Sequence, residues 1–315
     1  MRYFLLAPLT PAIGGVTIPS NELLIYLQLK GKVYTVDLTS KSYLTNLFKV
    51  IYYSFKADVT IFCATKNAAF ILTIPLLFLK WITNSKLVMR KYGYGFFKKI
   101  ESSSFSYIFK YILNLYDLIC IETFDEYKKY SNYYKNCIVC TNSRNNNLIV
   151  KDIERDEKCI YVGAIAEDKG LDKAIKFCNL NNLHLDIYGP TTEYLHFLMD
   201  NYDGFSYHNI ISPDDLRYVI PSYKYSILIS SHIGEGYPGF LISSLMYGVP
   251  VLVNDWGALK DLTDNGRCGY VVDEETYIGN IKYNKNFKSN CINFFRSNFD
   301  SNYNYQNLVK EISLL

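Results

Sequence analysis

The segment at residues 230–255 constrains the fold more than any other part of the chain. It reads SSHIGEGYPGFLISSLMYGVPVLVND and follows a short apolar run at 225–229. Pro238 opens a stretch with helical spacing and Gly248 ends it, and these are the usual start and stop signals of a helix. Residues 249–253 then predict another strand. The order of strand, loop, helix and strand is the repeating unit of a parallel α/β sheet.

The loop in this unit has the composition of an anion-binding site. In a parallel sheet, such a loop lies at the carboxyl edge of the strands, where the N–H groups of the next helix point into a crevice. Glu235 stands just before the predicted helix. Gly236 and Gly239 lack the Cβ atom that would hold a bound group away from the backbone. We therefore expect a negatively charged ligand at this loop.

The same residues resemble the signature of a known family. The run EGYP at 235–238, followed by Leu241 and by GVPV at 248–251, resembles the donor-site motif of the retaining glycosyltransferases of family 4. That family has the GT-B fold, in which two Rossmann-like, doubly wound α/β domains face each other across a cleft. Its motif has a second glutamate eight residues after the first, and this chain has Ser243 at that position.

The resemblance implies retaining transfer of a sugar from a nucleotide-diphospho-sugar to an acceptor. Glu235 would hold hydroxyl groups of the sugar, and Lys169, in a Lys-Gly pair that the family keeps, would stabilise charge on the departing diphosphate. A second diphosphate-binding position, an arginine in the family, holds Ala164. The donor-binding residues that the resemblance implies are Gly14, Gly15, Gly163, Gly189, Ile211, Gly236, Tyr237, Pro238, Gly239, Phe240 and Ser243.

Several of these assignments have a plainer alternative. The glycines at 14–15 follow the first predicted strand and form either a substrate contact or a tight turn. Lys169 is either a phosphate ligand or a solvated lysine, and Glu235 is either a sugar ligand or a favourable charge at a helix start. Ile211 would contact the base through main-chain atoms, so its identity does not disclose the base. Ser243 can bond a ribose hydroxyl but carries no charge.

Departures from the motif keep a second function open. Ala164, Ser243 and the lack of a histidine in the first half would also suit a non-catalytic protein that binds a glycan or a nucleotide sugar. The family often has a histidine where this chain has Arg90 and Lys91; one of these cations could replace the histidine electrostatically, but we expect a solvated basic pair. A nicotinamide-dependent oxidoreductase needs G-x-G-x-x-G after the first strand, and residues 13–16 do not supply it.

Length and patterning predict two domains. The 315 residues fit two domains of about 150 residues each. Residues 1–141 predict an acceptor-side domain, the polar run 142–158 a linker, and residues 159–302 the nucleotide-sugar-binding domain. A last helix at 303–315 is expected to pack back on the first domain, as in the family. Strands are expected at 3–7, 33–38, 59–64, 86–89, 117–122, 137–141, 159–162, 184–189, 225–229, 249–253 and 269–271.

Composition limits the partners and cofactors. The net charge of +3 is too small to favour a nucleic acid. The donor is expected to be a UDP- or GDP-sugar, the acceptor is unknown, and the motif implies no cofactor and no metal, since D-x-D is absent. Cys137 and Cys140 are interpreted as strand thiols rather than a zinc site. The amino terminus lacks the pattern of a signal peptide, which predicts a cytoplasmic setting.

Two apolar segments of the first half are expected to be buried. Residues 68–79 are shorter than the roughly 20 residues that a membrane-spanning helix needs. Residues 105–116 predict a helix that is apolar except for one narrow polar stripe. Such a helix is either buried on most sides or in contact with a lipid surface. Lys98 and Lys99, just before it, would suit anionic headgroups, so a peripheral membrane contact is the alternative to burial.

Overall fold

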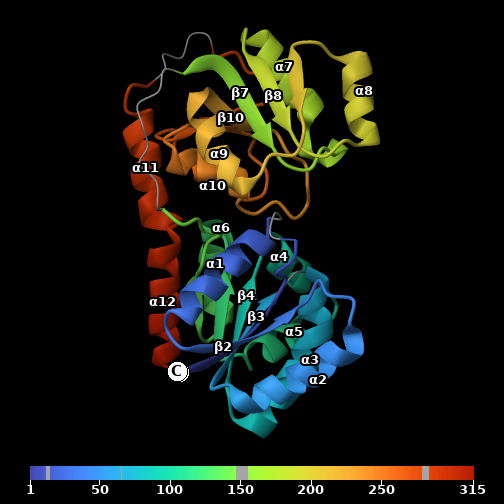
Figure 1. Ribbon diagram of the computed structural model, residues 1–315, viewed down its shortest axis with the longest axis vertical. Coiled ribbons are helices and arrows are strands. Elements are labelled where there is room, and N and C mark those ends of the chain that lie inside the picture. Colours follow the sequence, from blue (N-terminus) through green and yellow to red (C-terminus); the bar gives the residue numbers. More distant parts are fainter. Residues whose placement is uncertain (12–14, 65, 147–154, 279–283) are drawn as a thin grey trace. The chain divides into compact units, whose positions relative to one another are not determined.

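The chain forms two compact units (Figure 1). The first unit comprises Met1–Asn145 together with Ser301–Leu315, and the second comprises Asn146–Asp300. Gly14 and residues 147–154 of the expected linker lie outside the described residues. The structure is a computed structural model that describes residues 1–11, 15–64, 66–146, 155–278 and 284–315.

The first unit is built on a parallel sheet of six strands in the part of the chain that the structure describes. The strands pair in the order β2-β1-β3-β4-β5-β6, and every pair is parallel. All six residues of β3 are buried, as expected for a strand with helices on both faces. The strands are β1 (Arg2–Ala7), β2 (Lys32–Asp37), β3 (Val59–Ala64), β4 (Lys86–Lys91), β5 (Leu118–Ile121) and β6 (Cys137–Val139).

Helices cover both faces of this sheet (Figure 1). On one face, α1 (Thr17–Gln28) and α12 (Ser301–Ser313) pack in one core cluster, to which α12 contributes Tyr305, Leu308 and Ile312. The other face carries α2 (Tyr43–Lys56), α3 (Lys66–Thr83), α4 (Phe96–Glu101), α5 (Ser106–Leu113), α6 (Phe124–Tyr130) and the short 3₁₀ helix η1 (Ser131–Tyr133).

The basic pair at the end of β4 is buried, so the prediction of a solvated pair is wrong. Arg90 is 0% exposed and Lys91 is 3% exposed. The Arg90 guanidinium lies 5.1 Å from the ring centroid of Tyr305 and donates hydrogen bonds to the carbonyls of Pro19 and Thr141. Aromatic faces and carbonyl oxygens thus replace water around this cation. Because Tyr305 belongs to α12, Arg90 also ties that helix to the sheet.

The expected burial of the two apolar segments is confirmed for only one side of each helix. In α5 only Leu113 is buried, while Tyr107 and Tyr111 are exposed. In α3 Ile74 and Phe78 are exposed. The sheet covers one side of each helix, so a helix that is apolar all round must present the rest of its apolar residues outward. In the described ranges, no helix combines the length and the apolar character that crossing a bilayer requires.

The second unit has a parallel sheet of its own, again of six strands among the described residues. The strand order is β12-β11-β10-β7-β8-β9, which reverses between β7 and β10. The first strand begins at Asp156, so the last residues of the expected linker belong to a strand. The strands are β7 (Asp156–Val162), β8 (His184–Tyr188), β9 (Phe205–His208), β10 (Tyr223–Leu228), β11 (Val251–Val253) and β12 (Gly269–Val271).

Helical segments follow most strands of the second sheet. The prediction of an α/β chain with two doubly wound parallel sheets is therefore confirmed. The helical segments are η2 (Glu167–Lys169), α7 (Leu171–Leu180), α8 (Glu193–Asn201), α9 (Pro213–Val219), η3 (Ile220–Ser222), α10 (Gly239–Met246), η4 (Leu259–Thr263) and α11 (Phe287–Asn298).

Candidate functional site

The candidate site lies at the carboxyl edge of the second sheet, where the strand order reverses. From β7 the chain passes to β8 on one side, while β10 lies on the other side of β7. The segments that follow β7 and β10 carry Lys169 and Glu235. Ligands of open α/β sheets bind at such a reversal point. The topology therefore brings together two residues that are 66 positions apart in the sequence.

Lys169 and Glu235 form an ion pair. The Lys169 Nζ atom lies 2.7 Å from Oε2 of Glu235, and the two side chains are 20% and 9% exposed. The Ser230 hydroxyl donates a second hydrogen bond of 2.7 Å to the same oxygen. Among the described residues, no hydrogen bond reaches the other carboxylate oxygen, Oε1. The carboxylate is thus held by one oxygen, and the second is available to a ligand.

Further hydrogen bonds join the loops that carry this pair. The carbonyl of Asp168 accepts a hydrogen bond of 2.8 Å from the Ser231 N–H, and it lies 3.1 Å from the Ser230 hydroxyl oxygen, whose single proton is donated to Glu235. His232 Nδ1 lies 2.6 Å from Asp168 Oδ2, and the His232 carbonyl accepts a bond from the Trp256 indole N–H. None of these residues was predicted to belong to the site. Their signal was position alone, because Asp168 precedes Lys169 and Ser230 closely follows β10.

Only a glycine fits after Lys169, for a steric reason. Gly170 has a φ of +62°, and a Cβ atom on it would lie 1.9 Å from the carbonyl oxygen of Ile229. Gly257, with a φ of +57°, similarly approaches the carbonyl of Glu235, since a Cβ atom there would lie 2.5 Å from it. Any larger residue would push these segments apart. The two glycines therefore allow the loops to hold Lys169 and Glu235 in contact.

The start of α10 faces the same edge, and among the described residues the N–H groups of Gly239 and Phe240 have no hydrogen-bond acceptor. Pro238 is its N-cap and supplies no side-chain hydrogen bond. The first intrahelical bond runs from the Ile242 N–H to the Pro238 carbonyl, so the N–H groups of Gly239 and Phe240 precede it. Such groups, together with the helix dipole, favour a bound anion.

The other predicted residues of this segment are anchored by their own contacts. Gly236 is buried beside Glu235. The buried Tyr237 donates a hydrogen bond of 2.7 Å to Oδ2 of Asp261. Ser243 lies one turn into α10, is 7% exposed, and donates to the Gly239 carbonyl at 3.0 Å. Its hydroxyl oxygen still has lone pairs that can accept a hydrogen bond.

Ala164 stands at the position where the family has an arginine, and its main-chain carbonyl takes part in a hydrogen bond. The carbonyl of Ala164 accepts a 2.7 Å hydrogen bond from the Tyr161 hydroxyl. Burial raises the pKa of Tyr161, and the carboxylates of Glu235 and Asp168 raise it further. The phenol therefore stays protonated and remains a donor. Its ring packs against that of Phe240 in α10, with 5.4 Å between the centroids.

The remaining predicted residues lie in loops that follow strands of the two sheets. Gly163 follows β7 and Gly189 follows β8, and a Cβ atom on Gly189 would lie 2.2 Å from the Gly163 carbonyl oxygen. Ile211 is half-buried in the loop between β9 and α9. These three share the carboxyl edge of the second sheet with Glu235. Gly15 belongs to the first unit, and a Cβ atom on it would meet nothing within 4 Å.

Comparisons with known proteins match the second unit to a family. Residues 143–286 match the family described as glycosyl transferases group 1. No curated protein sequence matches the chain.

Solved structures match the whole chain. Anabaena HepE in complex with UDP and glucose has a TM-score of 0.74 at 12% identity, over all of both chains. Sucrose-phosphate synthase from Thermosynechococcus elongatus has a TM-score of 0.75 at 12% identity, over all of this chain and 98% of that chain. A glycosyltransferase from Rickettsia africae has a TM-score of 0.71 at 14% identity, over 98% and 97%. The predicted GT-B fold is confirmed.

Proposed function

We propose that this chain, whose residues 143–286 match the glycosyl transferases group 1 family, is a retaining glycosyltransferase of family 4 that uses a nucleotide-diphospho-sugar. The observation that carries the proposal is the contact between Lys169 and Glu235 at the reversal point of the second sheet. There an ammonium, a carboxylate and the N–H groups of a helix start lie at one sheet edge. A donor substrate needs partners for its phosphates and for its sugar hydroxyls, and this edge offers both.

In this proposal Glu235 binds the transferred sugar. Its Oε2 atom is fixed by Lys169 and Ser230, which orients Oε1 toward the site. A carboxylate oxygen accepts hydrogen bonds from sugar hydroxyls, and such charge-assisted bonds are stronger than those between neutral groups. Because two partners hold Oε2, the geometry is set before the sugar arrives, which lowers the entropy lost on binding.

Lys169 and α10 act on the leaving group. An ammonium has three N–H donors, and the bond to Glu235 uses one of them. The others can reach phosphate oxygens, and the N–H groups of Gly239 and Phe240 supply neutral donors beside them. These groups stabilise the charge that grows on the diphosphate as the sugar leaves. With this charge supplied by the protein, we propose that transfer needs no metal ion and no cofactor.

We propose a hexose linked to UDP as the donor. HepE was solved in complex with UDP-glucose and with UDP and glucose. The main chain at Ile211 would contact the base, Ser243 the ribose, and the backbone at Gly163, Gly189 and Gly236 the sugar and phosphates. A GDP-sugar is the second candidate. The acceptor, a glycan, lipid or protein, would be bound by the first unit, where Gly15 follows β1.

Titration with nucleotide sugars tests the proposal. The whole chain is titrated calorimetrically with UDP-glucose, UDP-galactose, UDP-N-acetylglucosamine and GDP-mannose, and donor hydrolysis and transfer are followed with and without EDTA. We expect binding and turnover with a UDP-hexose, unaffected by EDTA, and a product with the donor's anomeric configuration. Binding without turnover for every donor would support a non-catalytic binding protein, for which Ala164 and Ser243 are the motivating departures. Failure of every donor to bind would refute the proposed site.

A further inference from the structure

The outer surface of the first unit is apolar over α2, α3 and α5. More than half of the exposed large hydrophobic side chains among the described residues lie between Tyr43 and Leu115. Soluble surfaces rarely present large apolar side chains side by side without a partner. We call this surface the apolar face, and its most prominent side chains are Leu44, Phe48, Phe78, Trp81, Tyr107 and Ile108, all more than half exposed.

The orientation of α2 shows that the apolar face is not the leftover side of ordinary helices. A helix packed only on its own sheet directs its apolar residues inward. In α2 the only buried residue is Ser54, whose hydroxyl bonds back to the Val50 carbonyl. Leu44, Phe48 and Phe55 instead face outward, at 75%, 71% and 57% exposure. Val50 and Tyr53 of α2 pack against the core, but most apolar residues of the helix point away from the sheet.

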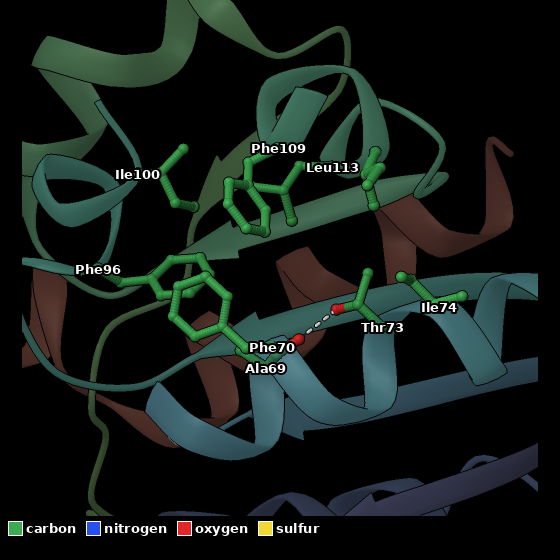
Figure 2. A pocket seen from close by; sticks show the side chains of 9 residues that line it. Ala69, Phe70, Thr73, Ile74, Phe96, Ile100, Phe109 and Leu113 are labelled. Atoms are coloured by element: carbon green, nitrogen blue, oxygen red, sulfur yellow. Dashed lines mark hydrogen bonds between the residues drawn. The ribbon is translucent and has the colours of Figure 1, made fainter. Parts of the chain in front are cut away.

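The apolar face is continuous across the helices. α2, α3 and α5 lie on the same face of the sheet, and α3 and α5 share a pocket (Figure 1, Figure 2). Figure 2 shows Phe70 of α3 and Phe109 of α5 at this pocket, which has a volume of about 30 Å³. An adjoining cavity of about 200 Å³ is lined by these two rings together with Lys99 and Ser103. The surface is therefore hollowed between α3 and α5, with an ammonium beside the hollow.

The charged residues on the three helices of the apolar face have one sign. α2, α3 and α5 contain no aspartate or glutamate. Lys49 and Lys56 are exposed on α2, and Lys98 and Lys99 are exposed on the neighbouring α4. The acidic residue of α4, Glu101, accepts a hydrogen bond from a tyrosine of α6. Exposed lysines beside apolar and aromatic side chains complement a surface that is anionic outside and apolar beneath.

We propose that the apolar face docks on a lipid bilayer that contains anionic lipids. The side chains of Trp81 and Tyr107 combine an apolar ring with a polar group, which suits the boundary between headgroups and acyl chains. The lysines then lie at headgroup level, with their aliphatic stems along the apolar surface. This inference does not depend on the donor site, because every residue that carries it belongs to the first unit.

Tryptophan fluorescence can locate the contact. The chain has two tryptophans, Trp81 on the apolar face and Trp256 in the second unit. In the Trp256→Phe variant, Trp81 emission should move to shorter wavelength on adding vesicles of phosphatidylcholine and phosphatidylglycerol, and brominated acyl chains should quench it. In the matched Trp81→Phe variant, the remaining emission should be unchanged. Unchanged Trp81 emission, or equal quenching in both variants, would overturn the proposal.

Vesicle sedimentation tests which side chains bind. Phe48→Ser combined with Trp81→Ser should lower the partition coefficient by about tenfold or more, since two large apolar side chains lose contact with lipid. The matched control is Ile25→Ser, which removes a 60% exposed residue from α1 on the opposite face of the same sheet. Equal binding by the double variant would contradict the proposal. Circular dichroism checks that each variant is folded.

Two further experiments test the role of the lysines and the binding of a second copy of the chain to the apolar face. Lys98→Glu with Lys99→Glu should weaken binding to anionic vesicles several-fold, whereas Lys310→Glu on α12 should not. Ultracentrifugation of the lipid-free chain tests for a second copy on the apolar face. A dimer that Trp81→Ser dissociates, together with no binding to vesicles, would assign this face to a protein interface and refute the lipid proposal.

Discussion

The two units place buried charge differently. In the second unit, Glu235 is 7% exposed, contacts Lys169, and keeps one carboxylate oxygen without a hydrogen bond among the described residues. In the first unit, Arg90 is 0% exposed and its guanidinium lies 4.8 Å from the Tyr92 ring and 5.1 Å from the Tyr305 ring. One charge is held at a sheet edge that a ligand can reach, and the other is enclosed in a core.

Functional charge and structural charge can therefore be told apart in similar folds by what surrounds them. Desolvating a charge is unfavourable wherever it occurs, so a buried charge is expected to have a favourable interaction that offsets this cost. For Glu235 the expected interaction is with a ligand, and for Arg90 it is the contact that attaches α12 to the sheet. Substitutions in the second unit should therefore impair activity and leave stability intact, and those in the first unit should do the reverse.

Glu235→Ala should have the largest effect. Losing the carboxylate that holds the sugar should lower turnover by about 10³-fold, or about 4 kcal/mol of transition-state stabilisation, with little change in melting temperature. Initial rates with the preferred nucleotide sugar measure this loss. The control is Glu157→Ala, which removes the carboxylate of an ion pair with Lys224 on the same two strands. Undiminished turnover in Glu235→Ala would refute the assigned role.

Arg90→Ala should destabilise the first unit by about 3 kcal/mol, because a buried cation, its aromatic contacts and its hydrogen bonds are lost together. Urea unfolding followed by Trp81 emission in a Trp256→Phe background reports on this unit. Affinity for UDP, which depends on the second unit, should not change. Lys310→Ala, an exposed change on α12, serves as the control. Lower UDP affinity with unchanged stability in Arg90→Ala would contradict a structural role for Arg90.

Lys169→Ala should weaken UDP binding by about 30-fold, since a charge-assisted hydrogen bond to phosphate contributes about 2 kcal/mol. Calorimetric titration with UDP measures the effect, and the difference from the native chain should shrink at high salt. Lys176→Ala, an exposed residue of α7, is the matched control. Equal affinity in Lys169→Ala and the native chain would show that this ammonium does not contact the diphosphate.

The stability of the first unit should depend on pH through Glu126. Burial raises the pKa of Glu126 to about 7 from 4.5, while the Gly95 N–H lowers it in opposition. The folded chain holds this proton more tightly than the unfolded chain, so the stabilisation is complete below pH 4.5 and is lost as pH rises through about 7. Between pH 5 and 7.5, the unfolding free energy should fall by on the order of 2 kcal/mol more than in Glu126→Gln. Urea unfolding across that range checks this, and identical pH slopes would contradict it.

Local signals were enough to predict most of the fold. The strand at 59–64 is a short apolar run and was predicted with its observed bounds. Pro238 and Gly248 marked the limits of α10 because their effect on the backbone is local. The strand β9 was missed, since Phe205–His208 is short and mixes polar with aromatic residues. The sequence motif also predicted Lys169 and Glu235 as site residues, but only the strand order explains why they are in contact.

Long-range contacts could not be predicted from local patterns. The burial of Arg90 depends on Tyr305, which lies far along the chain in α12. The bond between His232 and Asp168 depends on the pairing of β7 with β10. Periodicity shows that a helix has an apolar side but not which way that side turns, so the outward orientation of α2 became visible only in the structure.

The place of α12 in the first unit has a consequence for biosynthesis. Tyr305, Leu308 and Ile312 complete the core on one face of the first sheet, yet they emerge from the ribosome only after the whole second unit. Until then, α1 covers only part of that face, the part under α12 remains open to water, and the Arg90 guanidinium lacks the Tyr305 ring. The nascent first unit therefore stays incomplete while the second unit is being translated, and a chaperone that binds exposed apolar strands has that interval in which to act.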